Sequence, residues 1–410
     1  MESTSQSVKT GPKDESRPDL PEDQPTGPLA LVMSGGGARA AYQAGFLSGL
    51  GDRLPDLELP ILTGVSAGAI NAAFLAAAEG NFRERTTSLC DLWRSIEIND
   101  VLDTRPYELL RIVGGWGLKL ATGGRLGRKR RQGFVDTRPL QETLARYLKP
   151  QADGSLPGVT KRIESGTLQA LAVTGSSYTS GKSVTWVQGS RIQDWERPTR
   201  RSVAAPIRVD HIMASAALPF LFPPVRVENA WFGDGGIRLT APLAPAVHLG
   251  AGRLLALSTR FRGRAQSKDV DEQGDDPAPA QIGGTLLNAI FLDLVDQDAL
   301  NMERLNRLIH KLPSDKRGSL RPVDLAVVRP SRDLGKLAND HEARLPKGLR
   351  FLTRGWGTRE TRSNDLLSLL MFQPDYLSRL VELGRSDADE LGAEIEPFLL
   401  GRTDYSRRTL

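Results

Sequence analysis

Two strand-to-helix units near the start of the chain most constrain its fold. The first has the apolar run LALVM at 29–33, three glycines at 35–37 and an alanine-rich stretch at 38–50. The second has the run ILTGV at 61–65, followed by AGAINAAFLAAAEG, which is rich in the strongest helix former. Apolar strands that alternate with helices in this way indicate a parallel sheet with helices on both faces.

Later segments continue the alternation. The runs at 167–177 and 183–189 predict a pair of strands joined by a turn, and those at 253–261 and 323–330 predict further buried strands. Apolar residues recur at helical spacing over 282–312, which predicts one long helix or two shorter ones. The sequence therefore predicts an α/β protein.

Composition shifts divide the chain of 410 residues. Residues 1–27 are polar and contain proline, which is typical of a disordered tail. Residues 28–261 hold every motif discussed below and form the expected main domain. The acidic, proline-bearing stretch 262–280 is expected to be a surface loop, and 281–410 a largely helical extension packed on that domain.

The sequence predicts a cytoplasmic protein. Its single cysteine, Cys90, excludes an internal disulfide framework. The N-terminal segment has no apolar signal core, so no signal peptide is expected. The longest alanine-rich apolar stretch, 67–78, is shorter than the roughly 20 residues that span a bilayer. The net charge of +5 slightly favours anionic partners.

The glycine turn at 35–37 is suited to point backbone N–H groups at a negative group. Together with Ala40 it matches the relaxed dinucleotide pattern G-x-G-x-x-A. That pattern also needs an acidic residue at the end of the next strand. Asp56 and Glu58 precede the strand instead. Nucleotide binding remains an alternative to binding an oxyanion.

Gly64-Val65-Ser66-Ala67-Gly68 matches G-x-S-x-G between a strand and a helix. This is the nucleophile elbow, in which a strained turn exposes a serine hydroxyl at a helix N-terminus. The alternative is a tight turn with a capping serine. A serine nucleophile needs oxyanion donors, and the glycine turn at the end of the neighbouring strand can supply them.

The base that would activate Ser66 is either a histidine or a carboxylate. Of the four histidines, His248 fits the order Ser-Asp-His, but it lies near the expected end of a helix. Asp234, in WFGDGG, can accept the serine proton directly if it is buried and bonded to the hydroxyl. The alternative for Asp-Gly is a hairpin turn.

These blocks together resemble the patatin-like phospholipases. The resemblance rests on GGGAR at 35–39, GVSAG at 64–68 and DGG at 234–236, with ASAALPFLFPPV at 214–225 before the aspartate. It covers roughly 28–261, which it implies to be the catalytic domain, with 281–410 packed on that domain or over the substrate entrance. It is nearest to bacterial members. It implies a three-layer α/β/α sandwich with a mostly parallel central sheet.

The resemblance also implies a Ser66–Asp234 dyad with no catalytic histidine, and phospholipase A or lysophospholipase-type hydrolysis of lipid esters. It places the oxyanion hole at the glycine turn and Ala67, supported by Arg39. It implies no cofactor and no metal, and the single cysteine and four scattered histidines show no metal-ligand spacing. The implied oxyanion-hole and motif residues are Gly35, Gly36, Gly37, Ala67, Gly64, Gly68, Gly235 and Gly236.

Two positions depart from the family pattern. Ala40 stands where the family often has glycine, and Thr240 where it often has asparagine. Neither carries the chemistry, so they bear on loop shape and substrate fit. The alternatives that remain are a Ser-His-Asp esterase using His248 and a catalytically silent lipid-binding protein.

A phospholipid or other acyl-ester substrate requires access to a membrane surface. The segment 119–131 carries six basic residues and no acid, next to apolar and aromatic sequence. Such a segment can bind anionic headgroups, which predicts peripheral contact with the inner membrane face; the alternative is a solvated loop. No nucleic-acid partner is expected, because no binding module accompanies the segment. The basic residues are Lys119, Arg125, Arg128, Lys129, Arg130 and Arg131.

Overall fold

The computed structural model describes residues 27–102, 135–190, 192–219, 221–261, 282, 285–286, 294–345, 350 and 364–402. Nearly all of the predicted N-terminal tail lies outside these residues. The basic segment 119–131 and the predicted loop 262–280 lie outside them as well.

A ten-stranded sheet forms the centre of the molecule. Its main path runs β10-β9-β1-β2-β3-β4-β6-β5, and β8 pairs with both β3 and β7. The five strands from β10 to β3 are parallel. Strands β3 and β4, the predicted pair joined by a turn, are antiparallel. The strands are β1 Leu29–Met33, β2 Ile61–Val65, β3 Ala170–Ser177, β4 Ser183–Gly189, β5 Glu196–Arg197, β6 Arg200–Ala204, β7 Val225–Val227, β8 Ala230–Asp234, β9 Arg253–Leu257 and β10 Asp324–Val328.

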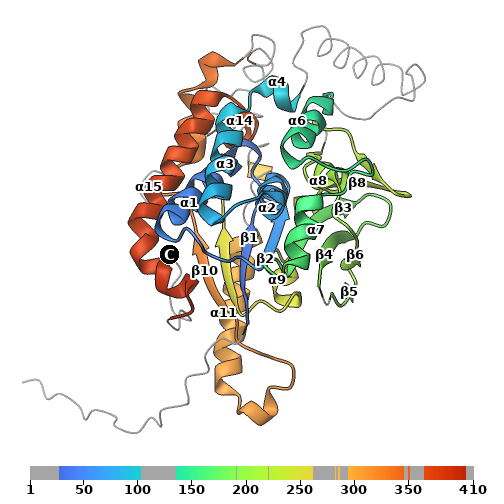
Figure 1. Ribbon diagram of the computed structural model, residues 1–410, viewed down its shortest axis with the longest axis vertical. Coiled ribbons are helices and arrows are strands. Elements are labelled where there is room, and N and C mark those ends of the chain that lie inside the picture. Colours follow the sequence, from blue (N-terminus) through green and yellow to red (C-terminus); the bar gives the residue numbers. More distant parts are fainter. Residues whose placement is uncertain are drawn as a thin grey trace, which may run out of the picture.

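Helices lie on both faces of the sheet (Figure 1). Helices α1, α2, α3 and α15 belong to the larger apolar core, and α9 and α11 to the smaller one. The helices are η1 Gly37–Arg39, α1 Ala40–Arg53, α2 Ala67–Ala77, α3 Phe82–Ser95, α4 Ile98–Val101, α6 Arg138–Leu148, α7 Pro157–Glu164, α8 Val209–Ser215, η2 Gly235–Ile237, α9 Ala244–His248, α11 Leu294–Lys311, η3 Ser314–Lys316, α12 Leu334–Asn339, η4 Glu342–Arg344, α14 Asp365–Leu370 and α15 Pro374–Leu399.

The central strand β1 shows why the sheet needs two helical layers. Its residues are all buried, and they alternate between two apolar cores. Leu31 and Met33 contribute to the larger core, and Ala30 and Val32 to the smaller one. Continuous apolar runs such as LALVM are typical of parallel strands covered on both faces. The predicted three-layer α/β/α sandwich is confirmed.

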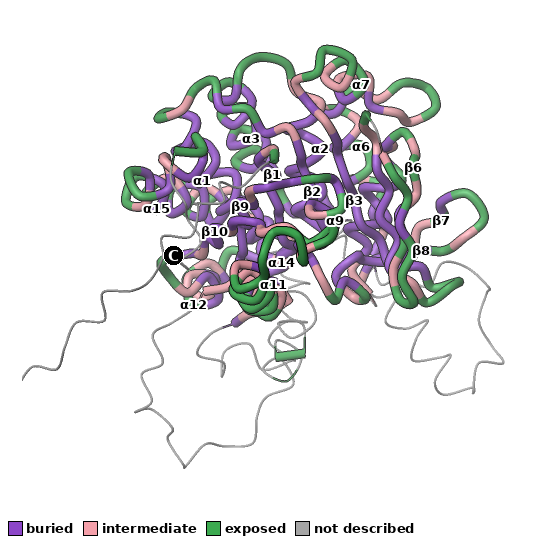
Figure 2. The backbone as a smooth tube through the Cα atoms, turned by 90° about the horizontal axis from the view of Figure 1, so that it is seen from below, coloured by how far each residue is buried: buried purple, intermediate pink, exposed green. Residues whose placement is uncertain are grey.

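The C-terminal region is built into this sandwich. Strand β10 adds an edge strand beside β9, and α15 packs along α1. A side chain at Gly45 or Gly384 would clash with the facing backbone, because a Cβ would lie 2.1 Å from the oxygen of Val381 or 2.2 Å from that of Tyr42. Seen from below, the central strands β1, β2 and β3 and most of α1 are buried, while α11 is largely exposed (Figure 2). None of the helices in the described residues has the length and apolarity to cross a membrane.

Candidate active site

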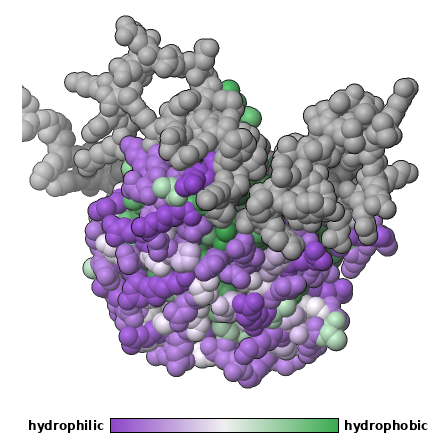
Figure 3. Space-filling view, turned by 90° about the horizontal axis from the view of Figure 1, so that it is seen from above, coloured by the Kyte–Doolittle hydropathy of each residue, from purple (hydrophilic) through white to green (hydrophobic). Residues whose placement is uncertain are grey.

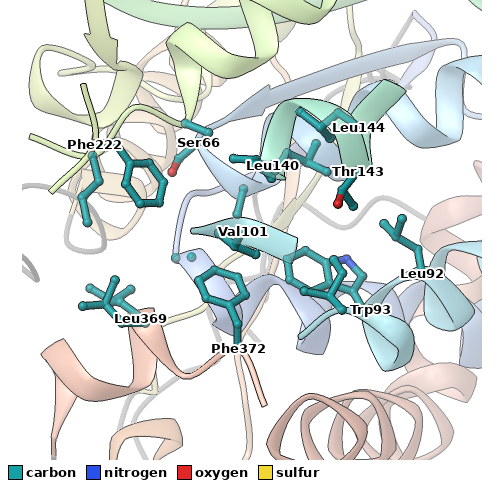
Figure 4. Close-up of a pocket in the computed structure, with 18 residues that line it drawn as sticks. Ser66, Leu92, Trp93, Val101, Leu140, Thr143, Leu144, Phe222, Leu369 and Phe372 are labelled. Carbon is teal, nitrogen blue, oxygen red and sulfur yellow. The ribbon is translucent and has the colours of Figure 1, made fainter. Parts of the chain in front are cut away.

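Ser66 stands between β2 and α2 in a strained backbone conformation. Its φ is 56° and its ψ is −131°, a sparsely populated region that costs about 1–3 kcal/mol for a residue other than glycine. The side chain makes no capping hydrogen bond to α2, so the interpretation of Ser66 as a simple capping residue is wrong. The hydroxyl instead points into a cavity (Figure 4).

The glycines on either side of Ser66 allow backbones to approach one another. A Cβ at Gly64 would lie 2.4 Å from the carbonyl oxygen of Gly68, and one at Gly68 would lie 2.4 Å from that of Met33. Neither glycine has a positive φ. The strain of the elbow is therefore carried by Ser66 itself, and the glycines keep the turn free of steric clashes.

Strand pairing brings Asp234 beside Ser66. Strand β2 pairs with β3 up to Val65, which lies opposite Thr174. At the next residue of β3, Gly175, the partner is Asp234 of β8. At Gly175, β4 pairs with one side of β3. Strand β8 therefore pairs with the other side, where β2 has ended. Asp234 is thus placed where the chain turns away at Ser66.

Asp234 is fully buried. Its Oδ1 accepts a hydrogen bond from the Gly236 N–H at 2.9 Å, whereas its Oδ2 has no partner of standard geometry among the described residues. Burial raises the pKa of Asp234 to about 7, while hydrogen bonding from the Ser66 hydroxyl and the Gly236 N–H lowers that pKa. Catalytic hydrogen bonds often reach ideal geometry only with substrate bound. Asp234 can therefore accept a proton near neutral pH.

The glycine turn lies against the same cavity as Ser66. Gly36, Gly37 and Ala67 line it, and Gly37 and Ala67 are the first residues of η1 and α2. The N–H groups at helix starts have no partner within their own helix, so these two can bind an oxyanion. Gly35 lies next to Ser66, because a Cβ at Gly35 would be 3.0 Å from the Ser66 Cβ.

The cavity next to Ser66 is almost entirely apolar. Its volume is about 60 Å³. It extends from Ser66 and Phe222 towards Trp93 and Leu92 (Figure 4). Seen from above, a small hydrophobic area is visible near the middle of the molecule (Figure 3). Other lining residues are Ile70, Ile96, Val101, Leu140, Thr143, Leu144, Ala216, Leu218, Leu369, Leu370 and Phe372.

None of the four histidines lines this cavity. His248 stacks on Trp195, which belongs to the smaller core on the other face of the sheet. His211 stacks on Trp186, and its Nδ1 accepts the Arg208 N–H at 3.1 Å. Burial and the nearby Arg208 charge lower the pKa of His211 to about 4. Within the described residues, no cluster of three or more His, Cys, Asp or Glu side chains could hold a metal.

Sequence reasoning missed two hydroxyl side chains that hold the site. The Thr259 hydroxyl donates to the Gly35 carbonyl at 2.8 Å, fixing the glycine turn. The Ser215 hydroxyl accepts the Ser66 N–H at 2.9 Å and donates to the Thr174 carbonyl at 2.6 Å. Ser215 lies within the segment ASAALPF, which resembled the family pattern but revealed no role.

Replacing Ser215 by alanine is expected to impair the strained elbow. The buried Ser66 N–H and Thr174 carbonyl would lose their partner, which costs about 1–3 kcal/mol of unfolding free energy. A misplaced nucleophile is expected to lower kcat about tenfold with little change in KM. Urea unfolding and ester kinetics would test this, with Ser165→Ala, at an exposed hydroxyl in a helix end, as the control. Equal kcat in the two variants would contradict it.

An α/β sandwich that presents a serine at a strand-to-helix turn has the architecture of an ester hydrolase. A family model described as patatin-like phospholipase matches residues 31–247, just over half of the chain. The chain therefore belongs to the patatin-like phospholipase family and is a lipid ester hydrolase. No curated protein matches the sequence.

Two solved structures illustrate how distant the structural relatives are. VipD from Legionella pneumophila has 13% sequence identity and a TM-score of 0.39, with 90% of this chain and 67% of VipD covered. Human GIVD cytosolic phospholipase A2, in complex with methyl γ-linolenyl fluorophosphonate, has 12% identity and a TM-score of 0.45. The match covers 95% of this chain but only 61% of the human chain.

Proposed function

We propose that this protein hydrolyses acyl esters of phospholipids or lysophospholipids with Ser66 as nucleophile and Asp234 as general base. The observation that carries the proposal is the buried Asp234 carboxyl group beside the strained Ser66. Its Oδ2 has no hydrogen-bond partner of standard geometry among the described residues. The neighbouring Ser66 hydroxyl lowers the pKa of the carboxyl group, against the larger effect of burial. The other carboxyl oxygen is held by Gly236, which orients the group.

In this mechanism the Ser66 Oγ attacks the ester carbonyl carbon while its proton passes to Asp234. The N–H groups of the turn at 36–37 and of Ala67 stabilise the oxyanion, and one such donor contributes about 3–4 kcal/mol. The bond to the leaving alcohol breaks as Asp234 returns the proton to the alcohol oxygen. Water then loses a proton to Asp234 and attacks the acyl group, and the released Ser66 Oγ regains that proton.

The apolar cavity supports a substrate with an acyl chain. Burying one methylene group contributes about 0.8 kcal/mol, so a chain of several carbons binds well in a cavity with almost no polar lining. Membrane contact through the basic residues at 119–131 is part of the proposal, as is a cytoplasmic location at the inner membrane face. Both rest on sequence alone.

The dyad predicts that His248→Ala retains wild-type activity within about twofold. His248 is exposed and does not line the cavity, and substitutions of such residues usually have little effect. Hydrolysis of a medium-chain ester and of a phospholipid in mixed micelles would be measured for both proteins. Loss of activity in a folded His248→Ala variant would favour a Ser-His-Asp triad instead.

The proposal as a whole is tested with the wild-type chain. We expect turnover of both substrates and covalent labelling of Ser66 by a fluorophosphonate probe, located by peptide mass spectrometry. An inert wild type with unlabelled Ser66 would overturn the proposal and favour a silent lipid-binding protein. Thermal stabilisation by a dinucleotide would favour the nucleotide-binding alternative.

A further inference from the structure

Helix α14, from the C-terminal region, is part of the wall of the candidate active site. Leu369 and Leu370 at its end, and Phe372 just after it, line the cavity that holds Ser66. Leu369 and Phe372 lie across the cavity from Ser66 and Leu140 (Figure 4). A region without a recognisable motif thus supplies apolar contacts where an acyl chain would bind.

Arg39 directs its guanidinium group at α14. Its Nε donates to the Ser368 hydroxyl at 2.7 Å. One terminal nitrogen donates to the Asp365 carboxylate at 2.5 Å and to the Asp365 carbonyl at 3.2 Å. Arg39 is only 2% exposed, so its contacts are fixed within the protein. Charge-assisted hydrogen bonds of this kind are roughly twice as strong as neutral ones.

The backbone of α14 also touches the glycine turn. A Cβ at Gly37 would lie 2.2 Å from the carbonyl oxygen of Leu369. The φ of Gly37 is 54°, which glycine adopts without a steric penalty. The turn that offers oxyanion donors and the helix that lines the cavity are therefore in direct contact.

We infer that Arg39 is a positioning residue that holds α14 through Asp365 and Ser368, so that the C-terminal region shapes the acyl-chain site and supports the oxyanion turn. This inference rests on the proposed function for its substrate. It assigns Arg39 a role different from adding positive potential to the oxyanion. The Asp365 carboxylate offsets the Arg39 charge, and the Nε and one terminal nitrogen of the guanidinium group donate to α14.

The two roles of Arg39 predict different results for Asp365→Asn. If Arg39 positions α14, Asp365→Asn weakens the same contact as Arg39→Gln, and both variants lose activity in a similar way. If the Arg39 charge stabilises the oxyanion, Asp365→Asn removes an opposing charge and activity is retained or increased. The two residues share one contact, so the double variant is expected to be little worse than either single variant.

The experiment compares p-nitrophenyl esters with acyl chains from two to twelve carbons. For both single variants we expect kcat/KM on the decanoyl ester to fall about tenfold or more. This fall corresponds to the loss of contact with about two methylene groups of the acyl chain. The acetyl ester, which reaches little of the cavity, is expected to lose less than about threefold. An equal loss on all chain lengths in Arg39→Gln, with Asp365→Asn like wild type, would overturn the inference.

Arg385→Gln is a matched control. Arg385 on α15 contacts Asp52 and Ser48 of α1, each at 2.6 Å. It therefore joins the C-terminal region to the core through the same residue types, but it does not line the cavity. We expect its chain-length profile to match that of wild type. A profile shifted as in Arg39→Gln would show that loosening any C-terminal contact has this effect, and would overturn a specific role for Arg39.

Hydrogen exchange tests the contact without any substrate. We expect amides of α14 to exchange faster in Arg39→Gln and Asp365→Asn than in wild type, while those of α15 keep their rates. Unchanged exchange in α14 would overturn the inference. If the wild type neither turns over esters nor reacts with fluorophosphonate, the proposed function fails, and the exchange result still decides whether Arg39 holds α14.

Discussion

Replacing Ser66 by alanine is expected to abolish ester hydrolysis, with kcat lowered about ten-thousandfold or more. The residual rate would come from the oxyanion donors and the cavity, which remain in place. Alanine keeps the Cβ that packs beside Gly35, and the backbone hydrogen bond from the Ser66 N–H to Ser215 does not involve the hydroxyl. The variant is therefore expected to fold.

The Ser66 prediction needs a measurement that separates loss of chemistry from loss of fold. Turnover in mixed micelles and fluorophosphonate labelling would be compared between Ser66→Ala and wild type, alongside thermal unfolding. We expect no labelling and a melting temperature near that of wild type. Ser165→Ala, at an exposed hydroxyl, serves as the matched control and should keep full turnover. A folded Ser66→Ala variant that still hydrolyses esters would exclude Ser66 as the nucleophile.

The parts of the site that the sequence predicted are those encoded over a few neighbouring residues. A buried strand, a glycine-bounded serine and an alanine-rich helix follow one another at 61–77, and each has a local pattern. The structure has β2, Ser66 and α2 in these places. The acidic residues Asp56 and Glu58 precede β2, as the sequence indicated, so the dinucleotide pattern remains incomplete.

The parts that sequence reasoning missed depend on contacts between distant positions. Arg39 and Asp365 are 326 positions apart, and Thr259 and Gly35 are 224 apart. No periodicity or short motif encodes which serine or threonine of the chain will reach a given backbone group. The same is true of α14: the sequence predicted a largely helical extension at 281–410, but not which of its residues line the cavity beside Ser66.

The structure shows why Gly64 and Gly68 must be glycine, which the sequence motif only partly predicted. The pattern G-x-S-x-G predicts a strained turn, but it does not say whether the strain falls on the glycines or on the serine. The positive φ belongs to Ser66, and Gly64 and Gly68 are needed because the Gly68 and Met33 carbonyls approach them closely. A sequence motif records that small residues are required, but it does not distinguish backbone freedom from lack of space.

Asp234 is expected to set the pH dependence of the wild-type enzyme. A general base acts only when it is deprotonated, and burial raises the pKa of Asp234 to about 7. We therefore expect kcat/KM to rise about tenfold per pH unit below this value and to level off above it. A profile that is flat from pH 5 to 8 would contradict the assignment of Asp234 as the base.

Asp234→Asn is expected to lower kcat about a hundredfold to ten-thousandfold, the usual contribution of a general base. The asparagine oxygen can still accept the Gly236 N–H, so the turn is preserved, but the amide cannot take the Ser66 proton. The residual activity should then lose its inflection near pH 7. Asp298→Asn is the matched control, because burial also raises the pKa of Asp298 and its carboxylate accepts a backbone N–H, that of Leu243. Asp298 does not line the cavity. If the inflection near pH 7 persists in Asp234→Asn but shifts in Asp298→Asn, the titrating group is Asp298 and not Asp234. That result would contradict the Ser66–Asp234 dyad.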